Sequence, residues 1–224
     1  MATISTVRLS TNHLEIRISR GLHSQERPLF SSIQFSDPPL TGGKLSFSLE
    51  KETGKKCYML PARELIIQCG DDRAYCKWTS RPDSRFSEVA ELLDVTWLHL
   101  RGKMETQMLS LKTTYAAYLV FKIAEQSFGL GSVKAYVRLV RELDQVQAED
   151  EAIIVALTSE ASRRAHRPRP KERNDGWMEI EMGEFFNDQG DAGEVGMRLM
   201  GIREFRFKSD LIVVGVELRP KENR

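Results

Sequence analysis

A side-chain alternation of period two recurs along most of this chain and constrains its fold more than any other feature. Val133, Ala135 and Val137 alternate with Lys134 and Arg138. The same alternation recurs at residues 45–49, 115–121, 178–182, 195–199 and 212–218. Successive side chains of a strand point to opposite faces, so this pattern predicts half-buried β-strands.

Three further runs are apolar on both faces and are expected to be central strands. They cover residues 65–67, 95–100 and 153–157, and the second contains Trp97, which we expect in the core. Residues 87–93 and 184–186 are expected to supply short helical turns. About eight to ten short strands with Gly- and Asn-rich turns predict an all-β, jelly-roll-like antiparallel β-sandwich.

Domain organisation follows from where the alternation begins. Residues 1–43 are expected to form a partly irregular N-terminal extension, with weak strand hints at Leu14, Ile16 and Ile18, and residues 44–220 to form the main domain. An acidic segment at 142–151 and a basic segment at 160–173 are both expected to be exposed loops.

Charge and cysteine content exclude several classes of protein. The 224 residues carry 33 Lys and Arg against 32 Asp and Glu, so no global charge favours nucleic acid or an anionic membrane. Cys57, Cys69 and Cys76 cannot all pair within one chain. Without a leader pattern or an apolar run of membrane-spanning length, we expect free thiols and a location in the cytoplasm and nucleus.

Catalytic and metal-binding motifs are missing from the sequence. It contains no phosphate-binding glycine loop, nucleophile elbow, HExxH or CxxC, and its four histidines are scattered. His99 is expected to be an ordinary strand residue. The chain is therefore predicted to be a binding module rather than an enzyme, with no cofactor and no metal.

The aromatic residues have two interpretations, core packing or a binding platform. Tyr75 and Trp78 follow a charged turn, and amphipathic rings in such places suit the C–H face of a sugar. Glu194, which follows a glycine-rich loop, could accept hydrogen bonds from sugar hydroxyls.

The basic segment likewise has two interpretations. It is either an ordinary solvated loop, or a functional segment that acts as a nuclear localisation signal or as a local anion-binding patch. The candidate residues are Arg163, Arg164, Arg167, Arg169 and Lys171.

Several ordered segments together resemble the plant phloem protein 2 family, the Nictaba-type lectins. They are KCYMLPARELIIQCGDDRAYCKW at 56–78, SRFSEVAELLDVTWLHLRGKMETQMLS at 84–110, TTYAAYLVFK at 113–122, RPKERNDGWMEIEMGEFFN at 169–187 and GVELRP at 215–220. The resemblance implies that the domain is a jelly-roll-like sandwich and that the protein resides in the cytoplasm and nucleus. It also implies binding of N-acetylglucosamine oligomers or the N-glycan cores of glycoproteins, often by a homodimer.

The family's sugar-binding positions carry over only in part. Tyr75 and Trp78 match a family tyrosine and tryptophan, and Glu194 matches one of two acidic site residues. Two stacking tryptophans of sugar-binding members are replaced here, at positions that hold Cys69 and Cys76. The second acidic position holds Gly201.

One branch of the family places an F-box before the lectin domain, and the chain is most similar to that branch. Residues 29–56 resemble the segment that joins the two domains there, but no F-box pattern is visible before them, so we expect it to be absent or truncated. Two alternatives to a lectin remain: a protein-interaction module that does not bind sugar, and a truncated F-box-type adaptor of a ubiquitin ligase. Neither a membrane nor a specific nucleic acid is an expected partner.

Overall fold

The computed structural model divides the chain into two units, between Ser31 and Ser32. It describes residues 45–68, 70–124, 127, 129–140, 152–188, 193–202 and 208–221, together with the strand backbones of 4–9 and 14–19. In the first unit, β1 (Ile4–Leu9) and β2 (Leu14–Ser19) pair as an antiparallel hairpin. The strand hints at 14–18 fall on β2, whereas β1 was not anticipated. The proposed division into residues 1–43 and 44–220 stays a prediction.

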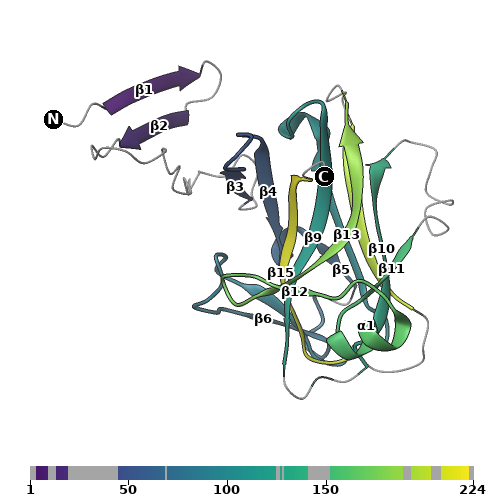
Figure 1. Ribbon diagram of the computed structural model, residues 1–224. Coiled ribbons are helices and arrows are strands. Elements are labelled where there is room, and N and C mark those ends of the chain that lie inside the picture. Colours follow the sequence, from purple (N-terminus) through teal and green to yellow (C-terminus); the bar gives the residue numbers. More distant parts are fainter. Residues whose placement is uncertain are drawn as a thin grey trace. The chain divides into compact units, whose positions relative to one another are not determined.

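The described part of the second unit is a sandwich of two antiparallel sheets with three short helical elements (Figure 1). The five-stranded sheet runs β11 (Ile153–Ala156), β10 (Ser132–Val140), β14 (Glu194–Gly201), β8 (His99–Glu105) and β5 (Ile66–Ile67). The eight-stranded sheet runs β12 (Lys171–Glu172), β13 (Met178–Asn187), β9 (Thr113–Ile123), β15 (Leu211–Pro220), β4 (Lys56–Pro61) and β3 (Ser46–Leu49). In the same sheet, β7 (Val89–Leu92) pairs with β15, and β6 (Cys76–Thr79) pairs with β7. The helical elements are η1 (Ala62–Glu64), η2 (Thr106–Met108) and α1 (Ser159–Ala165). The predicted all-β antiparallel sandwich is confirmed.

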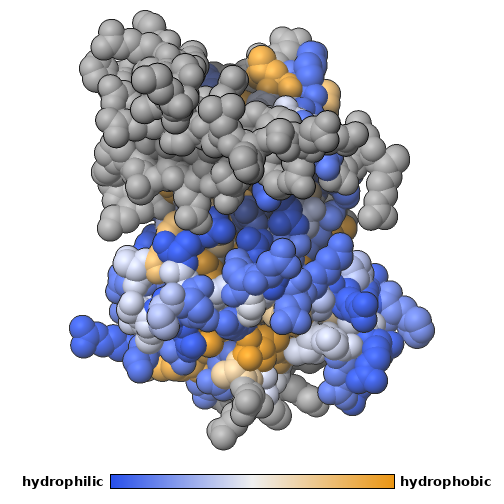
Figure 2. Space-filling model, turned by 60° about the vertical axis from the view of Figure 1, so that its left-hand side comes forward, coloured by the Kyte–Doolittle hydropathy of each residue, from blue (hydrophilic) through white to orange (hydrophobic). Residues whose placement is uncertain are grey.

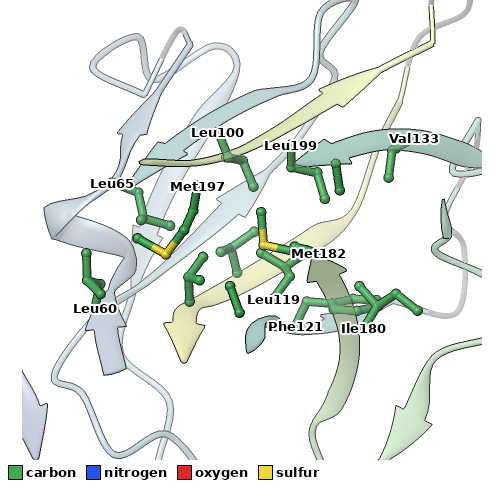
Figure 3. Close-up of a cluster of buried hydrophobic side chains, with 14 of the residues drawn as sticks. Leu60, Leu65, Leu100, Leu119, Phe121, Val133, Ile180, Met182, Met197 and Leu199 are labelled. Atoms are coloured by element: carbon green, nitrogen blue, oxygen red, sulfur yellow. The ribbon is translucent and has the colours of Figure 1, made fainter. Parts of the chain in front are cut away.

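The core lies between the two sheets and is built by the alternation seen in the sequence. Leu100 and Leu199 point inward from the five-stranded sheet and meet Leu119, Phe121 and Met182 from the other (Figure 3). All five are at most 2% exposed. Because burial of each large apolar side chain contributes about 1.5–3 kcal/mol, this layer holds the two sheets together.

Two of the expected central strands are edge strands, so that part of the prediction is wrong. β5 and β11 lie at the two margins of the five-stranded sheet. Ile66 and Ile153 are exposed there. A short apolar run gives the hydrophobicity of a segment, but it does not indicate whether the strand is hydrogen-bonded to another strand on both sides.

The run at 95–100 is not one strand, and the expectation that Trp97 is buried is wrong. Val95 makes an isolated bridge to Lys208, and β8 begins only at His99. The segment crosses from β7 in one sheet to β8 in the other. Val95 and Leu98 face inward at this crossing, whereas Trp97 is 51% exposed.

The helix predictions are also wrong. Residues 87–93 contain strand β7, and residues 184–186 belong to β13. The basic segment is not a continuous loop, because α1 begins at Ser159 and extends into it. The Thr158 hydroxyl accepts a hydrogen bond from the Ala161 N–H at 3.1 Å. This N-cap stabilises the first turn. The acidic segment at 142–151 lies outside the described residues.

Cys57 and Cys76 are buried free thiols, and Cys69 lies outside the described residues. Burial raises the pKa of Cys57 to about 12, so its thiol stays protonated at neutral pH. Across the described part of the chain, no group of three or more potential metal ligands converges. None of the described helices is long and apolar enough to cross a membrane.

Candidate functional site

Three connecting segments gather at one end of the sandwich. They join β5 to β6, β7 to β8 and β14 to β15, and we call their described residues 70–75, 93–98 and 208–210 the loop end. The Leu93 N–H donates to the Tyr75 carbonyl at 2.9 Å, and Val95 and Lys208 exchange two backbone hydrogen bonds of 2.9 Å. These bonds fix the segments against one another, so side chains on them keep a defined relative position.

Two aromatic rings are exposed at the loop end. Tyr75 is 39% exposed and Trp97 is 51% exposed. Asp71, Asp72 and Asp94 are exposed on the same segments. A flat apolar ring beside hydrogen-bonding groups is the usual composition of a wet binding site.

The positions that replace the family's stacking tryptophans do not offer a surface here. Cys76 is 2% exposed and belongs to the main core, where a tryptophan would not fit without displacing its neighbours. Cys69 lies outside the described residues. Gly201 does lie next to the loop end, where its N–H donates to the Leu98 carbonyl at 2.7 Å. A Cβ at Gly201 would come within 3.2 Å of the Lys208 side chain, which fills the space of the missing acidic group.

Trp78 is engaged by the protein itself. The Arg63 guanidinium lies 3.7 Å from the centre of its ring, and its indole N–H donates to the Gly70 carbonyl at 3.1 Å. Two hydrogen bonds of 3.0 Å to Glu88 hold Arg63 in this position. A sugar could stack on this face of Trp78 only after Arg63 had moved.

Glu194 lies far from the loop end. It begins β14 and Gly201 ends it, so seven strand steps of about 3.3 Å separate the two residues by about 23 Å. Its carboxylate pairs with the Lys103 ammonium at 2.7 Å. The structure therefore brings Tyr75, Cys76 and Gly201 to one end of the sandwich and leaves Glu194 at the other.

The candidate nuclear-signal residues are all exposed. Arg163 and Arg164 lie on α1, Arg167 and Arg169 follow it, and Lys171 is in β12. Arg164 pairs with Glu160 one helical turn earlier. The segment presents its charges to solvent on a short ordered scaffold.

A groove of about 360 Å³ lies elsewhere, between β10 and β13. Tyr136, Arg138 and Lys221 line it, together with Glu181 and Glu184. Lys221 pairs with both glutamates, so these charges satisfy one another. At the loop end, by contrast, the aromatic rings of Tyr75 and Trp97 are exposed at the surface.

Sequence reasoning missed Trp97 and did not single out Asp71 or Asp94 as site residues, and it also missed Lys208, which is buried beside Gly201. For Trp97 the alternation gave no clear signal, because Val95 and Leu98 are both buried and β8 begins only at His99. No sequence signal marks Lys208, whose position depends on pairing with Val95.

Comparison with known proteins identifies the family. Residues 55–220 match the family model of phloem protein 2. The F-box protein PP2-B10 of Arabidopsis thaliana is 40% identical over 202 residues, which cover 88% of this chain and 72% of that protein. The F-box protein At2g02240 of the same plant is 37% identical over 216 residues, 94% of this chain and 66% of that protein.

Among solved structures, the Podospora anserina GH26-CBM35 beta-(1,4)-mannanase is similar with a TM-score of 0.42 and 9% identity, over 75% of this chain and 28% of that one. This likeness is too low to support an argument about function. The family match and the two relatives carry the assignment without it. The chain therefore belongs to the phloem protein 2 family.

Proposed function

We propose that this chain is a carbohydrate-binding lectin module whose saccharide site is the loop end. The observation that carries the proposal is the exposure of Trp97 and Tyr75 on segments that backbone hydrogen bonds hold together. The Trp97 ring would stack against the apolar face of a pyranose. Asp71 and Asp94 would accept hydrogen bonds from the hydroxyls of the pyranose. They would thereby take the role that was expected of Glu194.

The proposed ligands are N-acetylglucosamine oligomers and the N-glycan cores of glycoproteins. Family membership supports this choice, and an acetamido methyl group adds apolar surface that suits an indole ring. A shallow platform gives a weak single site, so useful strength would come from avidity, for example in a homodimer. A glycan array with a multivalent form of the protein tests the choice. Signal on these glycans supports it, and an array at background level overturns it.

Replacing Trp97 with alanine is expected to weaken saccharide binding at least about tenfold, because the main apolar contact is lost. Leu111→Ala is the matched control, since Leu111 is 55% exposed but lies next to the start of β9, at the opposite end of the sandwich. Isothermal titration with an N-acetylglucosamine oligomer measures both variants. Equal affinities for the two variants would contradict the assignment of the loop end.

A second candidate function is that of an adaptor in a ubiquitin ligase. The observation that favours it is the similarity to proteins named F-box proteins over 88% and 94% of this chain. A pull-down with the ligase subunit that recognises F-boxes tests it, and absence of binding disposes of it. Capture of a partner that survives deglycosylation and is not displaced by chitin oligomers would instead favour recognition of a polypeptide.

We also propose that the protein resides in the cytoplasm and nucleus and that the exposed basic segment acts as its nuclear signal. Neutralising Arg163, Arg164, Arg167, Arg169 and Lys171 together is expected to shift a fluorescent fusion from the nucleus to the cytoplasm. Imaging measures the ratio of nuclear to cytoplasmic signal. The fusion protein must be too large to diffuse passively through the nuclear pore. An unchanged ratio of nuclear to cytoplasmic signal would contradict the proposal.

A further inference from the structure

Several lysine and arginine side chains lie on the outer face of the five-stranded sheet. Along β8, His99, Arg101 and Lys103 point outward, while Leu100 and Gly102 between them are buried. Five cationic side chains share this outward surface, which we call the cationic face: Arg101, Lys103, Lys134, Arg138 and Arg198. Two carboxylates on the same side, Glu105 and Glu194, stand at one end of it. On the side of the molecule that Figure 2 shows, hydrophilic residues cover most of the described surface and apolar residues form small patches.

Two arginines face each other directly across neighbouring strands. Arg198 on β14 is in register with Arg101 on β8, and like charges in this position destabilise a sheet. Their side chains turn apart: Arg101 donates to the His99 ring at 3.0 Å, and the Arg198 guanidinium lies 5.5 Å from the centre of the Tyr136 ring. Neither guanidinium has a carboxylate partner among the described residues. The repulsion is therefore left uncompensated within this part of the chain.

The eight-stranded sheet shows that this chain can pair the charged side chains on the outer face of a sheet. On the outer face of the eight-stranded sheet, Arg173, Arg219 and Lys221 each pair with at least two carboxylates. The chain has nearly equal numbers of acidic and basic residues. Charges could thus be paired on both sheets. On the cationic face Lys103 does pair with Glu194, at 2.7 Å, but Arg101 and Arg198 have no carboxylate partner among the described residues. Two neighbouring arginines without a carboxylate partner produce a local positive potential that attracts a ligand of opposite sign.

We propose that the cationic face binds an acidic, extended segment of another polypeptide. Side chains on one face of a sheet repeat about every 6.6–6.8 Å along each strand, and an extended peptide lying along the strands repeats at the same spacing. Glutamates at alternate positions would therefore meet successive rows of the face, and an arginine fork binds a carboxylate in two places.

Nucleic acid fits this face less well. Single strands bind by stacking bases on exposed rings, and the tyrosine among the described residues of this face, Tyr136, is only 6% exposed. The proposal goes beyond saccharide binding, since it uses the strands of one sheet and not the loop end. The two sites can be tested apart.

The test is a fluorescence-anisotropy titration at low salt with a short peptide in which glutamate alternates with serine. We expect the full chain to bind it, and to bind more weakly an isomer of the same composition whose glutamates are contiguous. Arg101→Gln/Arg198→Gln is expected to weaken binding of the alternating peptide about tenfold. Arg163→Gln/Arg167→Gln removes the same charge from exposed positions elsewhere and is expected to leave binding unchanged. Added salt is expected to weaken the interaction in the wild type.

A second measurement keeps the result independent of folding and of the lectin site. The Arg101→Gln/Arg198→Gln variant should unfold at the same urea concentration as the wild type or a higher one, because a repulsion is removed, and it should keep its saccharide affinity. Failure of the wild type to bind the alternating peptide would overturn the proposal. So would equal weakening by both double variants, equal binding of the two isomers, or preference for an oligonucleotide or a sulfated saccharide over the peptide.

Discussion

Replacing Arg173 with methionine is expected to lower the free energy of unfolding by about 3–5 kcal/mol. Arg173 Nη1 lies 2.9 Å from Glu179 Oε2 and 2.6 Å from Glu217 Oε2, and the three side chains are only 10–14% exposed. Among the described residues, Arg219 would then supply the remaining guanidinium beside the two carboxylates. Loss of Arg173 therefore leaves an uncompensated negative charge in a site with little water.

Arg164→Met is the matched control for this variant, because it removes an arginine from an exposed pair with Glu160. Exposed pairs contribute about 0–1 kcal/mol. Urea unfolding of both variants measures the difference. A loss of similar size in the two would show that the buried network does not stabilise the sheet as its geometry indicates.

Acid should reduce the difference between the wild type and Arg173→Met. Burial alone would raise the pKa of Glu179, but hydrogen bonds and charge from Arg219 and Arg173 outweigh it and hold the pKa below its usual range. A carboxyl with a lowered pKa stabilises the fold fully above its unfolded pKa of about 4.3, and this contribution is lost as the pH falls through the folded pKa. The stability gap should be full at neutral pH and narrow below about pH 4. A gap that stays constant down to acidic pH would contradict this origin.

Replacing Gly215 with alanine is expected to cost at least about 3 kcal/mol or to prevent folding. An added Cβ would lie 1.9 Å from the Leu60 carbonyl oxygen and 3.1 Å from the Pro61 Cα, both of which are backbone atoms. β15 pairs with β4, β9 and β7, and its register with β9 shifts between Val213 and Gly215. Backbone on either side can yield only by breaking strand pairing at the centre of the sheet.

Gly131→Ala separates this clash from a general effect of losing a glycine. A Cβ there would meet nothing within 4 Å, so a change of no more than about 0.5 kcal/mol is expected. Soluble yield and urea unfolding compare the two variants. Equal stability of Gly215→Ala and Gly131→Ala would contradict the close approach of the β15 backbone to the β4 backbone.

The strands with clear alternation could be predicted because their pattern reports one buried face. That reasoning located β9, β10, β13, β14 and β15, which supply most of the core. It failed where a segment's surroundings decide its structure. Residues 95–100 are apolar because they cross the end of the sandwich, and residues 184–186 became strand because β9 pairs with them.

The candidate site could be predicted only in part, because spacing in sequence does not give the end of the sandwich on which a residue lies. Tyr75 was recognised from the charged turn before it. Glu194 and Gly201 were expected to act together, yet they occupy opposite ends of one strand. Trp97 was assigned to the core from its apolar neighbours, but it lies in the connection before β8, where its side chain is 51% exposed.

Saccharide binding at the loop end is tested most directly by an amide NMR titration of the whole chain with an N-acetylglucosamine oligomer. We expect progressive, saturable shifts of the Tyr75 amide, the Leu93 amide and the Trp97 indole N–H, all of which lie on the loop end. Signals from Glu194 and from Leu111, at the opposite end, should stay in place. Shifts confined to those distant residues, or none at saturating oligomer, would contradict the proposal that this end of the sandwich is a lectin site.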